Sequence, residues 1–600
     1  MASPPAPAQI GQRRSYDGAL CTVRYIGEVA GATGSWLGVE WDDPSRGKHD
    51  GRHKGVRYFS CISKSPTAAS FVRPTRAADP PQSFLAALHL KYAGDPAEDP
   101  NPPRRIFFSG KIAEEVGFEK IRRKQAQLDE LQFVILDGAQ VAAASLSKEG
   151  GDAQGGEEQP ISQVCPKVRE LDLSRNLFEW FSPVVEICSE LKLLRSLRVN
   201  GNRFQDVLED TGLAAANGVF DGVTELALED TLLEWNEICH IAARFPDLTA
   251  LHAGTNQLSA LTAIPPAPFT STLTALHLEY NDFTSLASLA PLASIPTLRN
   301  LLLKGNRIAN ITPPDSSLPP PVFGPNLHYL DLSYNAIATW SFIDALPSSF
   351  PALTSLRVAH NPLYSDPDGD TTTATAAVTT QTTGSTISKT EEAYMLTLAR
   401  LPSLKALNFS AVTAPDRAEA EMFYLSRIAR QLAGVAEDDK AGQARVLAAH
   451  ARWGELCAAY GEPAVVRRAE VDPNFLEARL VSVEFMLDEQ ARGVQVPKSF
   501  DIYAVKGVVG RVFGVAPLGV RLVWETGEWD PVGGFDEVDE ESEEEEMEAE
   551  WERREEEGGM EGIERKGGRW VKREVELRDG PRQFGYCVDG LQARIRVERR

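Results

Sequence analysis

The segment Leu171-Asp-Leu-Ser-Arg-Asn176 recurs through the middle of this 600-residue chain. Its last position returns in clear copies as Asn202, Asn281, Asn306, Asn335 and Asn361, and in weaker copies as Thr231 and Asn256. Neighbouring copies lie 25 to 29 residues apart. A short apolar segment at a near-constant period predicts a solenoid, because each copy buries its apolar side chains only against its neighbours.

The spacing matches the leucine-rich repeat, whose period is about 20–29 residues. The leucines are expected to fill a shared core, and the Asn side chains to satisfy backbone groups at the turn after each strand. These Asn residues are therefore interpreted as structural. A ninth copy, Leu404-Lys-Ala-Leu-Asn-Phe409, lacks Asn at the expected position and predicts the end of the array. We place the repeats in residues 161–435, with a Thr-rich loop at 364–390.

Residues between the leucines face outward and form a mixed surface on which no catalytic triad or metal cluster is evident. His252 and His277 occupy the same position of adjacent repeats and are expected to be neighbours. Two His residues without further donors are a poor metal site. The chain also lacks the GxxxxGK[ST], GxSxG and HExxH motifs. We therefore expect a protein-binding surface, no cofactor and no enzymatic activity.

Short β-prone runs between glycines fill residues 10–80 and predict a small antiparallel barrel. Three segments lie within it: Gly34-Ser-Trp-Leu-Gly-Val-Glu-Trp41, Gly47-Lys-His-Asp-Gly51 and Gly55-Val-Arg-Tyr-Phe59. Their order and spacing closely resemble the CAP-Gly family. The resemblance implies a groove that binds the acidic, aromatic-ended C-terminal tail of α-tubulin.

The resemblance assigns the groove to seven residues: Trp36, Gly47, Lys48, His49, Asp50, Gly51 and Phe71. Trp36 and Phe71 are expected to form an apolar floor for the terminal aromatic residue. Lys48 is expected to pair with a carboxylate of the tail, and the glycines to allow close backbone approach.

Several residues of this region also have purely structural interpretations. Trp41, Tyr58 and Phe59 are interpreted as core residues, and Asp50 also as a turn former. Two departures from the family pattern are visible. His49 replaces the usual Asn, and Gly31 lies where many microtubule-tip members carry an aromatic residue. A shallower groove is therefore expected.

Residues 479–600 resemble a ubiquitin-like β-grasp. The pattern predicts strands at Leu480–Leu487 and Ser499–Val505, a helix at Lys506–Phe513, a strand at Gly519–Trp524 and two final strands. An acidic insertion, residues 536–561, interrupts them. Residues 81–160 are predicted to link the first domain to the repeats and to supply their N-terminal cap. Residues 436–478 are predicted to be a helical linker.

Composition excludes several classes of function. The net charge is −23, which disfavours nucleic-acid binding because phosphate neutralisation supplies most of that affinity. Residues 536–561 hold 16 acidic and 2 basic residues, or −14, and the remainder carries −9. The chain contains no apolar run of about 18 residues, so no membrane span is predicted. Seven scattered cysteines without a CxxC pair fit a reducing compartment, so a cytoplasmic location is expected.

The three predicted domains make a multidomain α+β chain, and their order resembles the tubulin-folding cofactor E family. That resemblance implies a chaperone that binds α-tubulin, acts with cofactors B, C and D and β-tubulin, and helps to assemble and dissociate the αβ heterodimer. It also implies association with the cytoskeleton. Two alternatives remain open: a microtubule-tip or cargo adaptor, and a ubiquitin-pathway adaptor that reaches the proteasome through the ubiquitin-like domain.

Overall fold

The computed structural model describes residues 8–93, 107–108, 111–112, 127–145, 159–313, 319–367, 388–465, 479–488, 490–532, 569–580, 582–588 and 590–599. The chain forms two compact units, one running to Val412 and the other beginning at Thr413. Most of the Thr-rich loop 364–390 and all of the acidic insertion 536–561 lie outside the described residues. Within the described residues, no helix is long and apolar enough to cross a membrane.

The first domain is a four-stranded antiparallel sheet in the order β1-β2-β3-β6. Its strands are β1 (Arg13–Tyr16), β2 (Ala19–Glu28), β3 (Ser35–Trp41) and β6 (Ala69–Val72), and a small hairpin joins β4 (Arg52–His53) to β5 (Val56–Arg57). Asp17 and Gly18 both have positive φ angles, as a two-residue turn between right-twisted strands requires. Tyr16, Val39 and Trp41 are buried in its core. The predicted small β-domain is thus confirmed.

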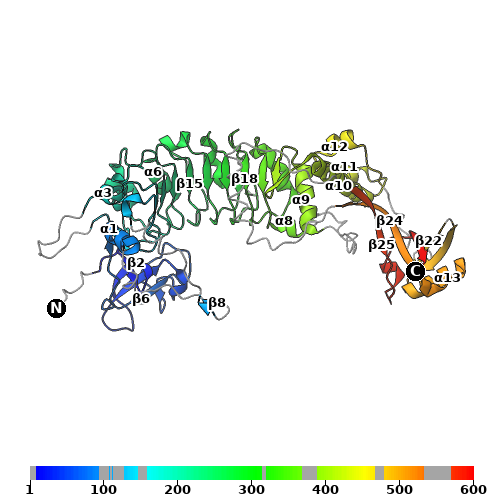
Figure 1. Ribbon diagram of the computed structural model, residues 1–600, viewed down its shortest axis with the longest axis horizontal. Coiled ribbons are helices and arrows are strands. Elements are labelled where there is room, and N and C mark those ends of the chain that lie inside the picture. The colour runs from blue at the N-terminus through cyan, green and yellow to red at the C-terminus, as the bar shows by residue number, and fades with distance from the viewer. Residues whose placement is uncertain are drawn as a thin grey trace, which may run out of the picture. The chain divides into compact units, whose positions relative to one another are not determined.

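The repeats form one sheet of eleven strands in the described chain, and all but the last pair are parallel. The strands are β10 (Phe133–Ile135), β12 (Glu170–Asp172), β13 (Ser196–Arg198), β14 (Glu225–Ala227), β15 (Ala250–His252), β16 (Ala275–His277), β17 (Asn300–Leu302), β18 (Tyr329–Asp331), β19 (Ser355–Arg357), β20 (Ala406–Leu407) and β21 (Ser410–Ala411). Figure 1 shows them stacked side by side from the cyan to the green repeats. A leucine stands at the centre of each strand from β12 to β19 and pairs in register with the next.

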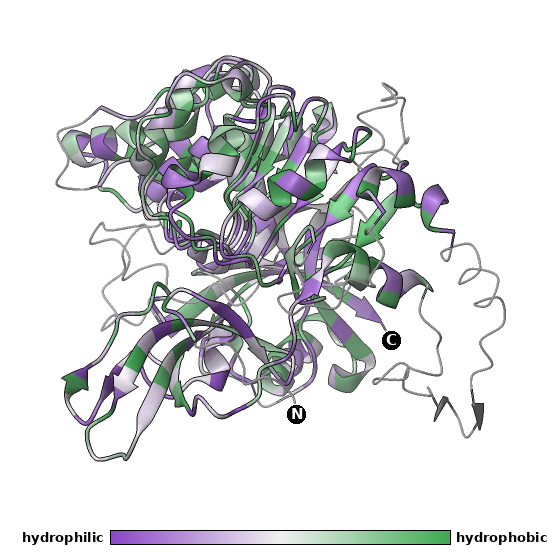
Figure 2. Ribbon diagram, turned by 90° about the vertical axis from the view of Figure 1, so that its left-hand side faces the viewer, coloured by the Kyte–Doolittle hydropathy of each residue, from purple (hydrophilic) through white to green (hydrophobic). Residues whose placement is uncertain are grey.

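Short helices return the chain from one strand to the next. They are α3 (Ile161–Val164), α4 (Ser182–Ser189), α5 (Thr211–Ala214), α6 (Trp235–Ala242), α7 (Trp340–Ser349), α8 (Pro362–Ser365) and α9 (Lys389–Arg400). Upstream, β7 (Gln82–Ser83) pairs with β11 (Val141–Ala143), α1 spans Phe84–Leu88, and β8 (Phe107–Phe108) pairs with β9 (Lys111–Ile112). Hydrophobic and hydrophilic residues interchange along these ribbons, as Figure 2 shows.

The repeated Asn side chains form the structural ladder that the sequence predicts. Asn281 Nδ2 donates to the carbonyls of Ala253 (3.0 Å) and Leu278 (3.1 Å), and its Oδ1 accepts from the N–H groups of Asn256 and Leu258 (both 3.0 Å). All members from Asn176 to Asn361 are buried. All of them except Thr231 and Asn256 donate to carbonyls of their own turn and of the preceding one.

The second unit begins with helices α10 (Ala414–Ala433), α11 (Lys440–Ala448) and α12 (Trp453–Tyr460). It continues with a mixed sheet in the order β23-β22-β26-β24-β25 and one helix, α13 (Ile502–Phe513). The strands are β22 (Leu480–Leu487), β23 (Gln490–Pro497), β24 (Val520–Val532), β25 (Arg569–Glu576) and β26 (Gln592–Arg599). The central pair, β22 and β26, is parallel, and the ubiquitin-like fold is confirmed.

One predicted strand of this domain is wrong. The second strand covers Gln490–Pro497, while the segment Ser499–Val505 holds a turn and the start of α13. Asp501 caps that helix by accepting from the N–H of Ala504 (2.7 Å). Ile502, Val505 and Val509 then place buried side chains on one helical face. The apolar run is helical because this cap precedes it.

Candidate functional site

The register of β3 and β6 brings the candidate floor residues to one face of the first sheet. Gly38 of β3 lies opposite Phe71 of β6, and Leu37 lies opposite Val72. Side chains alternate along a strand, so Trp36, Gly38 and Phe71 share a face while Leu37 and Val72 point into the core. Gly38 is required there because a Cβ would lie 2.3 Å from Cε1 of Phe59.

Phe71 is the centre of an aromatic cluster. It is half-buried, and five rings have centroids 5.0 to 6.3 Å from its own: Tyr25, His49, His53, Tyr58 and Phe59. Edge-on and tilted rings at these distances pack favourably. The cluster forms an apolar surface that remains partly open.

The loop Gly47–Gly51 is held against β6 by its backbone. The Lys48 N–H donates to the Ala69 carbonyl (2.7 Å), and the Ala69 N–H donates to the His49 carbonyl (2.7 Å). A Cβ on Gly47 would lie 1.8 Å from the Thr67 carbonyl oxygen, and Gly51 has a φ of +89°. These glycines therefore shape the loop itself, independently of any bound chain.

The loop and its hairpin carry a local positive charge. Residues 48–57 hold four basic residues and one acidic residue, or +3 with neutral His, within a chain of net charge −23. Lys48 is exposed, and its ammonium has no polar partner in the part of the chain that the structure describes. Asp50 pairs with Arg57 (2.9 Å) and accepts from the Arg52 N–H (3.3 Å), in agreement with its interpretation as a turn former.

His49 is positioned as a hydrogen-bond acceptor. Its Nδ1 accepts from the Gly51 N–H (3.1 Å), and its ring lies 5.0 Å from that of Phe71. Burial and the nearby His53 lower the pKa of His49 below its ordinary value. The ring is thus neutral at pH 7, with Nε2 as its remaining polar atom.

Trp36 was expected to form an apolar floor with Phe71, but Arg73 covers one face of its ring. The Arg73 guanidinium carbon lies 3.6 Å from the centre of the Trp36 ring, and Nη1 donates to the Thr33 carbonyl (2.6 Å). Arg73 follows β6 directly and so projects on the same side as Phe71. It adds a second cation beside the aromatic surface.

Sequence reasoning missed four groups at this site: Tyr25, His53, Lys54 and Tyr58. Tyr58 was interpreted as core, yet it is half-exposed, and its Oη accepts from the Ala30 N–H (2.8 Å). Trp41 and Phe59 are buried, as expected. Lys54 occupies the space above Gly31, because a Cβ added to Gly31 would lie 2.7 Å from Lys54 Nζ. A cation therefore stands where the expected aromatic residue is missing.

His252 and His277 are neighbours, as the repeat register predicts. Their rings are stacked with centroids 3.9 Å apart. Burial, with the nearby His277 and Arg198, lowers the pKa of His252 to about 3. Among the described residues, no group of three or more His, Cys, Asp or Glu side chains is placed to hold a metal ion.

Comparison with known proteins agrees with this architecture. The CAP-Gly domain model matches residues 10–77. The tubulin-specific chaperone E of Pongo abelii is 30% identical over 528 residues, which cover 86% of this chain and 92% of that protein. The chain belongs to the tubulin-specific chaperone E family. The Rattus norvegicus member is 31% identical over the same shares, and the tubulin-folding cofactor E of Arabidopsis thaliana is 26% identical over 73% of this chain and 75% of that protein.

Membership of the chaperone E family confirms the family expected from the domain order and gives the chain a role as a tubulin-folding chaperone. It also supports the prediction that the chain is not an enzyme, because the matched relatives are chaperones by name.

Proposed function

We propose that this chaperone binds α-tubulin by its acidic, aromatic-ended C-terminal tail in the groove between the Gly47–Gly51 loop and Phe71. In that role it takes part in assembly and dissociation of the αβ-tubulin heterodimer in the cytoplasm, together with cofactors B, C and D and β-tubulin. The observation that carries the proposal is the exposed Lys48 beside the half-buried Phe71 cluster. Lys48 offers a positive charge, and the Phe71 cluster offers apolar contact.

The chemistry of the groove suits such a tail. A charge-assisted hydrogen bond from Lys48 to a carboxylate is stronger than a neutral one. The loop charge of +3 attracts an acidic peptide, and the cluster around Phe71 offers edge-on packing to a terminal Tyr or Phe.

Substitution of Lys48 tests the proposal directly. Lys48→Ala in the full chain should weaken binding of a Glu-rich peptide ending in Tyr by about 1–3 kcal/mol, the range for a hydrogen bond to a charged group. Isothermal calorimetry measures the change, and Lys91→Ala, at another exposed lysine, should leave the affinity unaltered. A peptide without the terminal aromatic residue should lose most of its binding. Equal affinity of wild type and Lys48→Ala would remove Lys48 from the site.

Binding experiments distinguish the two adaptor alternatives from the proposed chaperone. A microtubule-tip adaptor sediments with polymer, whereas the proposed chaperone binds free tubulin dimers. A ubiquitin-pathway adaptor would bind the proteasome through the C-terminal domain. Charged side chains lie on the sheet of that domain, since Arg596 pairs with Glu525 (3.0 Å) and Glu598 (3.1 Å). Such a surface gives no specific support to the proteasome alternative.

A further inference from the structure

A fully buried arginine joins the first domain to the repeats. The Arg13 side chain is 0% exposed and pairs with Asp42 through two hydrogen bonds of 2.7 and 2.5 Å. Its Nη2 also points to the Asn176 carbonyl (3.4 Å), and its backbone N–H donates to Glu179 (3.0 Å). Both acceptors belong to the first repeat. A buried charge is costly unless it is paired and hydrogen-bonded, and Asp42 and Thr22 of the first domain pair with Arg13. The repeats add two further acceptors, the Asn176 carbonyl and the Glu179 carboxylate, to the same residue.

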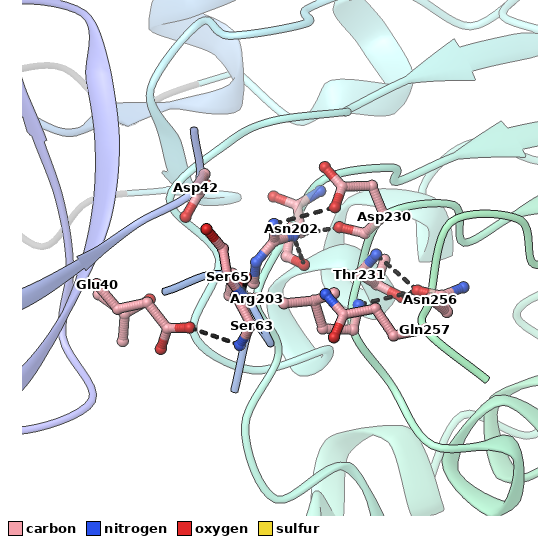
Figure 3. Close-up of polar contacts among 12 residues, drawn as sticks. Glu40, Asp42, Ser63, Ser65, Asn202, Arg203, Asp230, Thr231, Asn256 and Gln257 are labelled. Carbon is pink, nitrogen blue, oxygen red and sulfur yellow. Dashed lines mark hydrogen bonds and ion pairs between the residues drawn. The ribbon is translucent and has the colours of Figure 1, made fainter. Parts of the chain in front are cut away.

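A second ion pair continues the network on the side of the repeats. Arg203 is 7% exposed and bonds to the carbonyl and carboxylate of Asp230. Figure 3 shows Arg203 between Asp230 and Asp42 of the first domain. Burial opposes ionisation of Asp42, but Arg13 and then Arg203 hold the pKa of its carboxyl below the ordinary value. Charged side chains of both domains therefore lie close together around Asp42, with Arg13 and Arg203 buried.

A separate contact lies further along the array, at the repeats of Asn256 and Asn281. Lys64 Nζ pairs with Asp282 (2.6 Å) and donates to the Gln257 carbonyl (3.0 Å), and the Lys64 N–H donates to Gln257 Oε1 (3.2 Å). Between the two contacts, Gln205 Nε2 donates to the Gly11 carbonyl. We call these contacts the seat: Gly11, Arg13 and Lys64 on the first domain, with their partners on the repeats. Contacts at separate repeats prevent rotation about any one of them.

An exposed strip of stacked side chains begins where the seat ends. Asp282, which pairs with Lys64, also pairs with Arg307 (3.2 Å). Tyr280, 54% exposed, lies over Gly305, where a Cβ would be 2.3 Å from its ring. In the following repeats, Lys304 Nζ lies 5.3 Å from the centre of the Tyr334 ring.

The strip continues to one more repeat, because the Tyr334 ring stacks on that of His360 at 4.1 Å. Tyr280, Tyr334 and His360 all have positive φ angles, immediately before the buried Asn of their repeats. Exposed tyrosines held in place by stacking, with an Arg beside them, are typical of interface anchors.

The groove does not take part in the seat. The seat uses Gly11, Arg13 and Lys64, whereas Lys48 and Phe71 lie on the loop and strand that form the groove. Lys64 nevertheless precedes Phe71 by only seven residues, so the seat holds the chain that leads into β6. A domain held in this way presents its groove at a constant position relative to the strip. Two linked sites on one partner then bind with a high effective concentration.

We propose that the first domain is fixed in its seat on the repeats, and that the groove and the strip Tyr280–Lys304–Arg307–Tyr334–His360 bind one partner together. The partner is the folded body of the tubulin subunit whose acidic tail lies in the groove, so this inference rests on the proposed function. The continuity of strip and seat through Asp282 supports this occupant, because a protein held by its tail at the groove meets the adjoining repeats first. The basic and aromatic strip also suits a protein with an acidic surface.

The test compares two ligands, the acidic tail peptide and the intact tubulin dimer, on three full-length variants. Lys64→Glu/Gln205→Ala weakens the seat, Tyr280→Ala/Tyr334→Ala removes the strip, and Tyr503→Ala removes a matched exposed tyrosine from α13. The seat and strip variants should hold peptide affinity within about twofold and lose at least about tenfold in dimer affinity, the scale of a lost interface anchor. Tyr503→Ala should change neither.

Hydrogen exchange checks the seat independently of binding. In the wild type, the amides of Arg13 and Lys64, which donate to Glu179 and Gln257 of the repeats, should be protected. The seat variant should lose that protection while residues 37–41 in the core of the domain keep theirs. Unchanged dimer affinity in the seat and strip variants, or no protection at the wild-type seat, would overturn the inference. Failure of the wild type to bind the tail peptide would overturn the proposed function instead.

Discussion

At the scale of single residues, two glycines of the first domain are needed for different reasons: one for lack of space and the other for its backbone conformation. Gly47 has an ordinary φ of −85°, but a Cβ there would lie 1.8 Å from the Thr67 carbonyl oxygen. Gly18 has a φ of +77° and open space around it. The first position forbids a side chain by contact, and the second only disfavours one by backbone conformation.

Gly47→Ala should destabilise the first domain by about 3 kcal/mol or more, because backbone atoms cannot move aside as a flexible side chain does. Gly18→Ala should cost about 1 kcal/mol, the strain of a left-handed backbone for Ala. Chemical denaturation followed by tryptophan fluorescence measures both. Equal losses in the two variants would show that β6 shifts to accommodate the methyl group at Gly47.

His252 makes the stability of the repeats depend on pH. Its pKa is lowered to about 3 in the folded chain, from an ordinary value of 6.5, mainly by burial. The unfolded chain therefore binds a proton first as the pH falls below 6.5, and stability that is complete above that pH is lost. Glu225 lies 3.5 Å away on β14, His277 stacks from β16, and Arg198 faces from β13.

His252→Phe keeps the stacked ring and removes the titrating group. Between pH 7.5 and 5.0 the wild type should lose about 2 kcal/mol more than the variant, given about 1.4 kcal/mol for each pH unit below 6.5. Urea midpoints at the two pH values measure the difference, and the Arg198–Glu225 pair is common to both proteins. The same pH dependence in both would assign the acid sensitivity to other groups.

At the scale of elements, the Asn ladder links each turn of the solenoid to the next. Asn281 makes four buried hydrogen bonds with backbone groups of two repeats. Thr231 holds the same position with a shorter side chain and bonds to the Leu228 carbonyl (2.9 Å) in its own repeat. Its neighbour Asn202 reaches both its own turn, at Val199, and the preceding one, at Leu173.

Asn281→Ala should destabilise the array by about 3 kcal/mol, since it leaves several buried backbone groups unpaired. Thr231→Asn should stabilise it by about 0.5–1 kcal/mol, the net value of one added hydrogen bond. The matched measurement is the urea midpoint of each variant. A neutral Asn281→Ala would mean that water replaces the lost partners, which the burial of this position argues against.

The sequence predicts the repeats well because their period is carried by residues that act locally. Each Leu and Asn contacts the same positions of the next copy, so the pattern alone defines strand, core and turn. Prediction failed at Ser499–Val505, where a run of apolar residues fits either a strand or a helix and the cap at Asp501 decides for the helix. It also placed Tyr58 in the core, because the sequence does not show that this residue lies just after β5 and is only partly covered.

At the scale of the whole molecule, the seat is a feature that no local pattern predicts. Lys64 and Asp282 are separated by 218 residues, and Arg13 and Asn176 by 163. Each is an ordinary charged or polar residue in its own segment. Only the folded arrangement shows that Arg13 is fully buried and that its partner Asp42 faces Arg203. The motifs therefore predict the groove, but not the contacts between its domain and the repeats.

Net charge is also a property of the whole chain, and its sign is opposite to that of the local charge at the groove. The loop at residues 48–57 carries +3, whereas the chain carries −23, of which residues 536–561 supply −14. The attraction of an acidic tail by the loop is short in range, and its repulsion by the rest of the chain is long in range. Salt screens the long-range repulsion more than the short-range attraction, because the Debye length falls from about 30 Å at 0.01 M to about 8 Å at 0.15 M.

Deletion of residues 536–561 should therefore change association more than affinity. The deletion reduces the negative net charge from −23 to −9. At about 0.01 M salt, it should therefore raise the association rate of the acidic tail peptide roughly threefold, since like charge slows encounter. At about 0.15 M the two proteins should associate at the same rate, because the long-range term is screened. Stopped-flow mixing at both salt concentrations measures this. A rate that falls on deletion would mean that the acidic segment assists capture of the tail, and the contrast between loop and chain would then have the opposite meaning.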